Sequence, residues 1–382
     1  MMLIGPILLL LVLLGAPLFA IIAAGAVLNF DQAEIDLQAM AIEFYGIAEM
    51  PILLAIPLFT FAGYLLSESN APQRLVRLTS ALLGWMPAGL AIVSLVACAF
   101  FTAFTGASGV TIIALGAILF PAMQQAGYPE KFNLGLVTSA GSLGLLFAPS
   151  LPLILYGVVA EVPIENLFLA GLLPGFLMLL MLSAYSVWKN RAIRTPLGDF
   201  SWQEVRAALR ESMWEIPLPV VVLGGIYSGY FAISEAAAVT ALYVLIVDVV
   251  ILKEVSLRKL PAIIREAMIL VGGIMMILGV SRASTNFMID AGVPQQLLQW
   301  ISGFVTGEIA FMVMLLLFLL MLGAILDVFS AIVLVVPLIL PVATQFGVHP
   351  VHLGIVFLAT MQLGYITPPV GLNLFIAGYR FD

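Results

Sequence analysis

Two stretches of the sequence place prolines, glycines and small polar residues inside apolar segments. One runs from Gln362 to Leu374 and holds Pro368, Pro369 and Gly371; the other runs from Ser142 to Tyr156. Because proline cannot donate a backbone hydrogen bond, carbonyls and amides near the middle of a membrane would lose their helical partners there. Such groups are tolerated where they line a protein-enclosed cavity or hold an ion. Two broken helices at matching places in two halves indicate the binding site of a transporter.

Secondary transport needs no covalent chemistry, and the sequence contains no catalytic constellation. It also lacks a phosphate-binding Gly-Lys-Ser/Thr loop, which argues against a self-contained ATP-driven pump. What transport of an anion needs is oxygen ligands for a coupling cation and positive helix ends for a carboxylate. Hairpin tips that face broken helices offer both. We therefore expect no cofactor.

Each broken helix is expected to face a hairpin tip of its own half, which predicts two cation sites. The first comprises Gly106, Ala107, Ser108, Gly109, Ala148 and Pro149. The second comprises Asp327, Gly364, Thr367, Pro368, Val370 and Gly371. The side chains expected near the substrate are Ser108, Ser150, Ser330, Thr367 and Asn373. The alternative is that glycine and proline merely kink packed helices, while serine and threonine hydrogen-bond to nearby carbonyls.

Asp327 and Arg282 are two charged residues expected at membrane depth. A carboxylate there costs at least about 2.5–3.5 kcal/mol and is by default a functional hypothesis. Asp327 is expected to ligate or support the coupling cation, or alternatively to cap the second arm of its hairpin, because it precedes an apolar helical run. Arg282 either attracts a substrate carboxylate, or snorkels or pairs with Asp290 near the outer end of its span.

Three further polar residues are expected to have structural roles. Glu235 stands where it would cap a helix over 235–252. His349 and His352 have a spacing that suits a metal ion, but no acidic or cysteine partner accompanies them. We expect no metal site beyond those of the coupling cation.

Composition indicates a multi-pass membrane protein. The chain is 63% hydrophobic and 9% charged, whereas soluble domains are roughly 25% charged. Its single cysteine, Cys98, excludes an internal disulfide framework. The first apolar run, Met1 to Asn29, lacks a basic region before it and is too long for a signal peptide, so we expect it to span the membrane.

Hydropathy divides the chain into spans and longer apolar blocks. Single spans are expected at 3–28, 49–68, 166–188, 213–231, 233–252 and 264–289. Two blocks, about 87–123 and about 307–346, are too long for one span and have flexible centres, so each predicts a re-entrant hairpin. The blocks at about 132–160 and about 353–379 are the broken helices. With a cytoplasmic N-terminus, 13 of the 14 basic residues then lie inside, in agreement with the positive-inside rule.

The two halves also share residues at a nearly constant offset. The matching pairs include Pro121 with Pro341, Gly127 with Gly347, Gly144 with Gly364, and Pro149 with Pro369. Because the two segments cross the membrane in opposite directions, this predicts an inverted-topology repeat. The expected division is 1–48 (scaffold helix and outer arm), 49–160 (first repeat), 161–263 (scaffold helices and a cytoplasmic linker at 195–212) and 264–382 (second repeat). By symmetry with 166–188, we expect one further helix after Asp382 in the natural protein.

At this point the sequence resembles a known family. Gly224–Val239 is similar to the signature of the large membrane subunit of tripartite ATP-independent periplasmic (TRAP) transporters, the DctM-like family. Leu54–Gly63, Leu153–Gly157 and Thr367–Asn373 resemble it too, so the resemblance covers essentially the whole chain. This chain departs from the family pattern at the first tip, Thr105–Gly109, and also at the first break and in the signature turn.

The resemblance implies an all-α, inverted-repeat, elevator-type transporter in the bacterial inner membrane, driven by sodium. It thus implies Na⁺ as the coupling ion, bound at the two cation sites and supported by Asp327. It implies a small four-helix membrane subunit (DctQ-like) and a soluble periplasmic binding protein (DctP-like) as partners. The binding protein would deliver an organic acid such as a dicarboxylate or a sialic acid.

Two rival interpretations remain open. A stand-alone divalent-anion/sodium symporter shares the hairpin-plus-broken-helix plan, and only a strict requirement for a binding protein separates the two. An ion channel or a non-transporting scaffold is the alternative from another class. A channel would show no saturable, ion-coupled uptake, and no stretch of the sequence resembles a selectivity filter.

Overall fold

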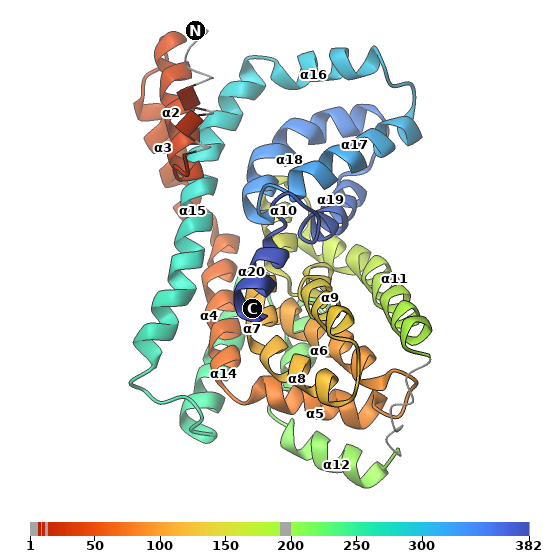
Figure 1. Ribbon diagram of the computed structural model, residues 1–382. Coiled ribbons are helices and arrows are strands. Elements are labelled where there is room, and N and C mark those ends of the chain that lie inside the picture. Colours follow the sequence, from red (N-terminus) through yellow and green to blue (C-terminus); the bar gives the residue numbers. More distant parts are fainter. Residues whose placement is uncertain (1–6, 9, 12–13, 192–199, 382) are drawn as a thin grey trace.

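The computed structural model describes residues 7–8, 10–11, 14–191 and 200–381. Every regular element within these ranges is a helix (Figure 1). The described part of the predicted span 3–28 contains α2 (Leu18–Gln32), whereas part of its start lies outside the described residues. The same holds for residues 195–199 of the predicted linker. The all-α prediction is confirmed.

Several helices are long and apolar enough to cross a membrane. By length and composition the described residues hold five such helices, or up to seven if two bent pairs are each counted as one span. The five are Pro51–Glu68, Ile164–Asn190, Ile233–Ile251, Leu260–Asp290 and Val328–Gln345. The chain is therefore a multi-pass membrane protein, as its composition predicts.

The predicted span at 213–231 is wrong as a full crossing. Its helix, α13, covers only Pro217–Tyr227, which is 11 residues. At 1.5 Å per residue that helix is about 16 Å long, well short of a hydrocarbon core of about 30 Å. A proline in the first turn begins it, and Gly229, with a φ of +73°, lies in the turn after it.

A column of helices stands beside the rest of the molecule in Figure 1. It consists of α15 (Leu260–Asp290), α4 (Ala55–Glu68) and α14 (Ile233–Leu245), and α4 packs against both of the others. A π-helical turn, Ile246–Ile251, continues α14. At one end of α15, α2 and α3 (Gln38–Gly46) pack against it.

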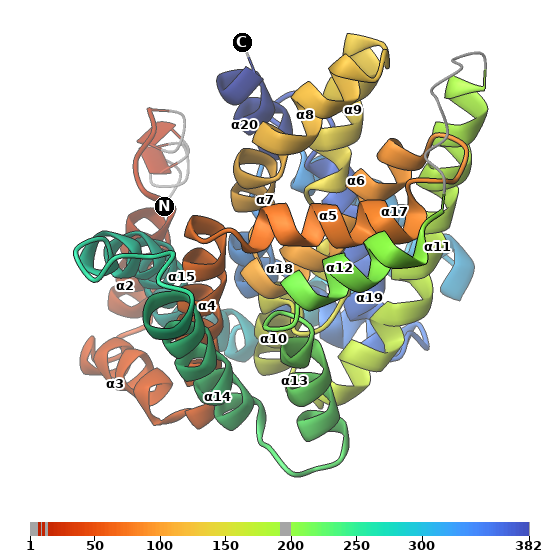
Figure 2. The ribbon, with the colours of Figure 1, turned by 90° about the horizontal axis from the view of Figure 1, so that it is seen from below.

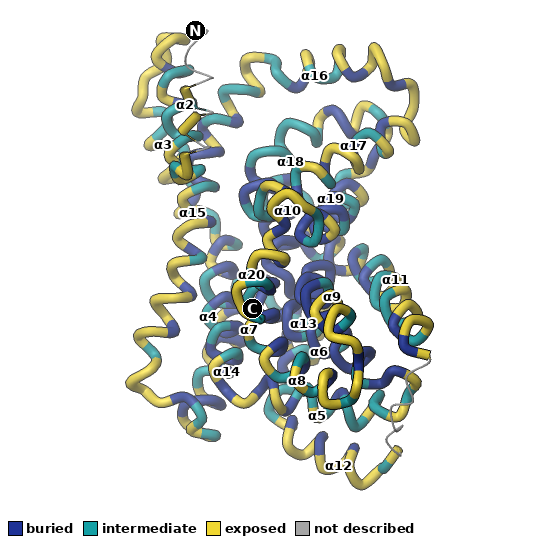
Figure 3. Tube along the Cα trace, in the orientation of Figure 1, coloured by how far each residue is buried: buried dark blue, intermediate teal, exposed yellow. Residues whose placement is uncertain are grey.

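The helices of the two predicted hairpins, together with the two broken helices and the helices α5 and α16, form the larger part of the molecule, called the hairpin body below. In chain order the first half contributes α5 (Ala71–Leu83), α6 (Gly89–Thr105), α7 (Ser108–Ala114), α8 (Gly116–Gln125), α9 (Glu130–Ala140), the 3₁₀ turn η3 (Leu143–Leu146) and α10 (Leu151–Val159). The second contributes α16 (Val293–Ser302), α17 (Glu308–Gly323), α18 (Val328–Gln345), α19 (Pro350–Gly364) and α20 (Leu372–Phe381). The buried residues concentrate where these helices cross (Figure 3).

The helix starts of the two halves correspond at the offset seen in the sequence. α7 and α18 begin at 108 and 328, and α9 and α19 begin at 130 and 350, a difference of 220 in each case. The turns before α9 and α19 hold Gly127 and Gly347, both left-handed with φ of +83° and +88°. Glycine suits such positions because it has no Cβ. The opposite membrane orientation of the two halves stays a prediction.

The remaining long helix and one amphipathic helix connect the two halves. α11 (Ile164–Asn190) runs along the outside of the hairpin body and presents much of its surface outward (Figures 1 and 3). α12 (Trp202–Glu211) is capped by Ser201, whose Oγ accepts a hydrogen bond from the Glu204 amide. It lies beside α5 at one end of the molecule (Figure 2).

Candidate functional site

The chain turns at the two predicted tips and interrupts its helices at the two predicted breaks. At the first tip α6 ends at Thr105, and Gly106 adopts a left-handed φ of +66° before α7 begins at Ser108. At the second tip, residues 324–327 separate α17 from α18. The first break bends the chain by 45° between Glu130–Leu146 and Leu151–Val159. The second break covers residues 365–371.

The second tip lies directly against the second break. The Ala324 carbonyl accepts hydrogen bonds from the amides of Val370 and Gly371, at 3.1 and 3.0 Å. Nearby, α19 approaches α17 so closely that a Cβ at Gly364 would lie 2.5 Å from the Cα of Gly323. The tip carbonyl thus provides an acceptor for two amides that have no helical partner at the break, where the prolines and Gly371 interrupt the helix.

Asp327 caps α18. Its Oδ1 accepts hydrogen bonds from the amides of Phe329 and Ser330, both at 3.0 Å, and the Ser330 hydroxyl donates to Oδ2. The Val328 amide, in turn, donates to the Tyr365 hydroxyl oxygen at 2.6 Å. The structural role considered for Asp327 is therefore present, and the carboxylate also holds Ser330 in place. Sodium ligation by Asp327 stays a prediction.

The first tip and first break are joined by close packing. A Cβ at Gly144 would lie 2.3 Å from the Ala99 carbonyl oxygen, and one at Gly106 would lie 2.4 Å from the Leu151 side chain. Between the hairpin and the broken helix, Thr102 of α6 donates a hydrogen bond to the carbonyl of Gly141, at the end of α9, at 2.8 Å. The Ser150 hydroxyl is buried and has no hydrogen-bond partner. A buried hydroxyl without a partner is uncommon, which makes Ser150 a candidate ligand.

Asn373 joins the two halves. Its Oδ1 accepts a hydrogen bond from the Ser108 hydroxyl of the first tip at 2.8 Å, and its Nδ2 donates to the Thr138 carbonyl of α9 at 3.1 Å. Both Asn373 and Ser108 are buried. α20 packs on α7 and α9, while α10 of the first half packs on α18 of the second. Each broken helix therefore sends its second segment into the other half, so pairing each tip only with its own break is incomplete.

Thr367 has a local partner. Its hydroxyl donates to the Leu363 carbonyl at 2.7 Å, which is the helix-type bond of the simpler interpretation. Pro368 and Val370 line an open depression of about 630 Å³, together with residues of α20. The second break thus reaches the protein surface on this side.

The sequence reasoning missed several residues of this region. They are Thr102 and Thr111 between the arms, Thr138 on α9, Ala324 at the second tip and Tyr365 at the second break. The three threonines lie inside long apolar segments, and that isolation was the available signal. Nothing in the sequence distinguishes the Ala324 carbonyl, because its role depends on backbone geometry alone.

The other candidate residues have structural partners. Arg282 pairs with Glu43 of α3, with 3.0 Å between Nε and Oε2, and not with Asp290. Glu235 accepts a hydrogen bond from the Ala232 amide at 2.9 Å, so the predicted cap is confirmed. His349 Nδ1 accepts from the Val351 amide at 3.2 Å. In the described ranges no three His, Cys, Asp or Glu side chains are grouped as a metal site would need.

A cavity of about 350 Å³ lies between the column and the hairpin body. Its lining comes from α15, α10, α18 and the short helix after α3, and includes Arg282, Asn286 and Leu340. A volume of this size is within the usual range for a small-molecule site.

Comparison with known proteins identifies the family. The model of the tripartite ATP-independent periplasmic transporter DctM component matches residues 6–379. The isethionate TRAP transporter permease protein DctMQ of Oleidesulfovibrio alaskensis is 35% identical over 364 residues, which cover 95% of this chain and 56% of that relative. This chain therefore spans little more than half of that protein.

This chain covers a larger share of two other relatives, both of them large permease proteins. The C4-dicarboxylate TRAP transporter large permease protein DctM of Pseudomonas aeruginosa is 33% identical over 342 residues, 89% of this chain and 80% of the relative. The ectoine/5-hydroxyectoine TRAP transporter large permease protein UehC of Ruegeria pomeroyi is 31% identical over 373 residues, 96% of this chain and 87% of the relative. The chain is thus a multi-pass inner-membrane transport component, not an enzyme, and it belongs to the DctM family of tripartite ATP-independent periplasmic transporters.

Proposed function

We propose that this DctM-family chain is the large transmembrane subunit of a sodium-coupled secondary transporter that imports an organic acid by an elevator mechanism. The observation that carries the proposal is the hydrogen-bonded link from Ser108 through Asn373 to Thr138. It brings a tip of one half and the broken helix of the other to one place, where helices begin and end inside the apolar body. Transporters place ion and substrate sites at such meeting points.

Sodium would be held mainly by oxygens. The unpartnered Ser150 hydroxyl and the carbonyls released at the two breaks are suitable ligands, since a hard cation prefers oxygen. Asp327 would contribute its charge while it caps α18. The coupling ion would thereby stabilise the conformation in which tips and breaks are in contact.

An anionic substrate would be attracted by helix N-termini. α10, α18 and α20 begin at Leu151, Val328 and Leu372, next to the breaks and the second tip. The start of a helix carries a partial positive charge, which favours a carboxylate without a permanent cation in the site. The proposed substrate is a dicarboxylate or a sialic-acid-like carboxylate.

The proposed partners are a DctQ-like small membrane subunit and a DctP-like periplasmic binding protein. One relative bears the combined name DctMQ, which supports the first partner. The relatives are named for C4-dicarboxylate, isethionate and ectoine, so similar permeases serve different compounds. This variety supports the view that the soluble partner selects the substrate. The N-terminus is proposed to be cytoplasmic.

Uptake into proteoliposomes tests the proposal. The chain, its small subunit and its binding protein would be reconstituted, and uptake of a labelled organic acid measured with an inward sodium gradient, with potassium in its place, and without the binding protein. We expect uptake only with both the sodium gradient and the binding protein. Uptake that continues without the binding protein would instead indicate the stand-alone divalent-anion symporter. Equal uptake in potassium would overturn sodium coupling.

A further inference from the structure

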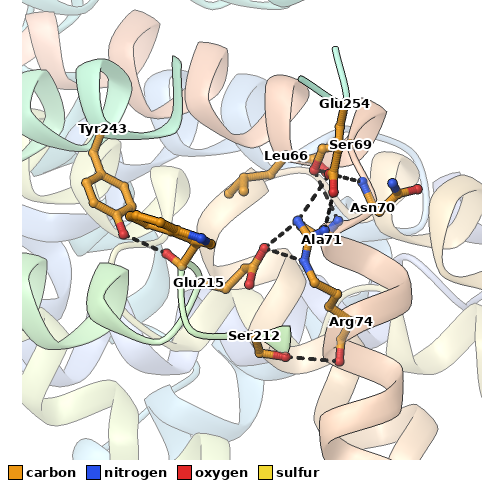
Figure 4. Close-up of polar contacts among 10 residues, drawn as sticks. Leu66, Ser69, Asn70, Ala71, Arg74, Ser212, Glu215, Tyr243 and Glu254 are labelled. Atoms are coloured by element: carbon orange, nitrogen blue, oxygen red, sulfur yellow. Dashed lines mark hydrogen bonds and ion pairs between the residues drawn. The ribbon is translucent and has the colours of Figure 1, made fainter. Parts of the chain in front are cut away.

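A buried ionic cluster lies at the end of the molecule opposite α16. Arg74 of α5 is only 7% exposed and pairs with two carboxylates from distant segments. Glu215, in the turn before α13, lies 2.6 Å from one guanidinium nitrogen, and Glu254, after the π-helical turn, forms the second ion pair (Figure 4). The Asn70 amide also donates to Glu254 at 2.8 Å, and the Ser212 hydroxyl donates to the Arg74 carbonyl at 3.4 Å. These bonds fasten α5 to the helices of the column and to the linker.

A third carboxylate lies within electrostatic reach of this cluster. Asp248, on the π-helical turn, is 1% exposed and interacts with Arg74, Glu215 and Glu254. Its backbone carbonyl accepts hydrogen bonds from the Glu254 and Val255 amides at 2.9 and 3.2 Å, which folds this segment back onto it. Its Oδ2 is buried without a hydrogen-bond partner, and so is Oε2 of Glu215.

The cluster has more negative than positive charge. One guanidinium faces three carboxylates, and it makes ion pairs with Glu215 and Glu254 but none with Asp248 among the described contacts. Other nearby charged or titratable groups are engaged elsewhere: Lys259 with Glu68, and the Tyr243 hydroxyl with the Trp214 carbonyl. A buried carboxylate without an ion pair is costly, and such groups normally take up a proton instead.

We propose that the Arg74 cluster is a proton-binding site in which Asp248 takes up one exchangeable proton and so strengthens the attachment of α5 to the column. The added proton removes the unpaired buried charge of Asp248, whose Oδ2 has no hydrogen-bond partner. Loss of the proton restores the repulsion among Asp248, Glu215 and Glu254 and weakens the contact. The site is separate from the sodium and substrate sites proposed above.

The direction of the pH effect follows from linkage. A carboxyl that binds its proton more tightly in the folded state makes that state bind more protons than the unfolded state. Stability then rises as pH falls through the folded pKa and stops rising near the unfolded value of about 4.

Thermal unfolding of the detergent-purified chain tests the proposal. Between about pH 8 and pH 6, a range in which ordinary carboxyls stay ionised, we expect the wild-type melting temperature to rise by roughly 2 °C or more. Asp248→Asn, whose neutral amide replaces the protonated acid, should abolish that rise and melt at or above the wild type at pH 8. Asp290→Asn, at an exposed carboxylate, is the matched control and should keep the wild-type pH dependence. An unchanged pH dependence in Asp248→Asn would overturn the proposal.

Infrared spectroscopy tests the same site directly and does not depend on the variant's stability. At about pH 6 ordinary Asp and Glu side chains are ionised, so a protonated-carboxyl stretching band in the wild-type protein must come from a perturbed group. We expect such a band, its loss at alkaline pH, and its absence in Asp248→Asn. If Asp248→Asn does not fold, Asp248→Glu should retain the band at a shifted frequency. A wild-type protein without the band at about pH 6 would refute the proton site.

Discussion

Asn373 is the side chain through which the two halves of the chain meet. It uses its oxygen for Ser108 and its nitrogen for Thr138, while it is completely buried. Few side chains satisfy a donor and an acceptor from two different elements at once, and an amide does so without a charge. At the scale of single residues, such contacts decide how the tips and breaks are held.

We expect Asn373→Ala to destabilise the folded protein. It removes two hydrogen bonds and leaves the Ser108 hydroxyl buried without a partner, a loss of about 1–3 kcal/mol for each unsatisfied group. The melting temperature in detergent measures this loss. Asn286→Ala, at an exposed asparagine, should melt close to the wild type. Equal melting temperatures for the two variants would contradict the role of Asn373.

Asp327 combines two roles that substitution can separate. Asp327→Ala removes the cap and should cost about 0.5–2 kcal/mol, whereas Asp327→Asn keeps an acceptor for the Phe329 and Ser330 amides and should cost less. Sodium binding to the folded state should raise the melting temperature in sodium chloride relative to choline chloride. If the Asp327 charge supports sodium, both variants should lose this rise. If Asp327→Asn keeps the full sodium-dependent rise in melting temperature, the role of Asp327 is capping alone.

At the scale of elements, close helix contacts hold the hairpins against the broken helices. α19 meets α17 at Gly364 and Gly323, and η3 meets α6 at Gly144, positions that correspond between the two halves. Neither approach leaves room for a Cβ. The glycines therefore set the distance between each hairpin arm and its broken helix.

Gly364→Ala should force α19 away from α17. The new Cβ would lie 2.5 Å from backbone atoms of Gly323, which no side-chain rotation relieves, and overpacking of this kind costs about 1–3 kcal/mol. Gly272→Ala in α15 is the matched control, since a Cβ there has no neighbour within 4 Å. The control should be neutral or more stable by up to about 1 kcal/mol, because alanine favours helix. Denaturation midpoints that fall equally in both variants would refute the close contact.

α5 carries two arginines with different environments. Arg77 is 46% exposed and pairs with Glu204 and Glu211 of α12, whereas Arg74 is buried. Arg74→Gln should cost about 3–5 kcal/mol, because it leaves buried carboxylates uncompensated. Arg77→Gln should lower the melting temperature much less, since exposed ion pairs contribute little. Comparison of the two melting temperatures tests this order, and an equal or larger effect of Arg77→Gln would reverse it.

At the scale of the whole molecule, the column of α15, α4 and α14 stands beside the hairpin body (Figure 1). α15 contacts α18 directly, and the cavity of about 350 Å³ lies between α15 and the hairpin helices. An elevator motion would slide the hairpin body along this boundary. The proposed mechanism therefore requires that the boundary be free to slip.

Cross-linking across this boundary should stop transport. Because Cys98 is the single cysteine and is buried, Cys98→Ala provides a background for new cysteines. Asn286→Cys on α15 and Leu340→Cys on α18 both line the cavity, so a short cleavable cross-linker should join them. We expect uptake to fall to background after cross-linking and to recover after cleavage. Undiminished uptake in fully cross-linked protein would exclude sliding at this boundary, and each single-cysteine variant serves as a control.

The sequence by itself determined the features that depend on local properties of the chain. Long apolar runs predict spanning helices, Pro149, Pro368 and Pro369 predict breaks, and the matching residues predict equivalent helix starts in the two halves. The predicted span at 213–231 is wrong because hydropathy alone does not show where the helix α13 begins and ends. These predictions work because helix continuity and membrane burial are set by each residue and its near neighbours.

Only the tertiary structure decided which distant segments meet. It carries α20 onto α7 and α9, pairs Arg282 with Glu43, and gathers Arg74, Glu215 and Glu254 from three segments. Ser108 and Asn373 are 265 positions apart, and nothing in either local sequence specifies the other. Such pairs form because whole helices dock to fill space and to satisfy buried polar groups, and that balance depends on all the packed surfaces together.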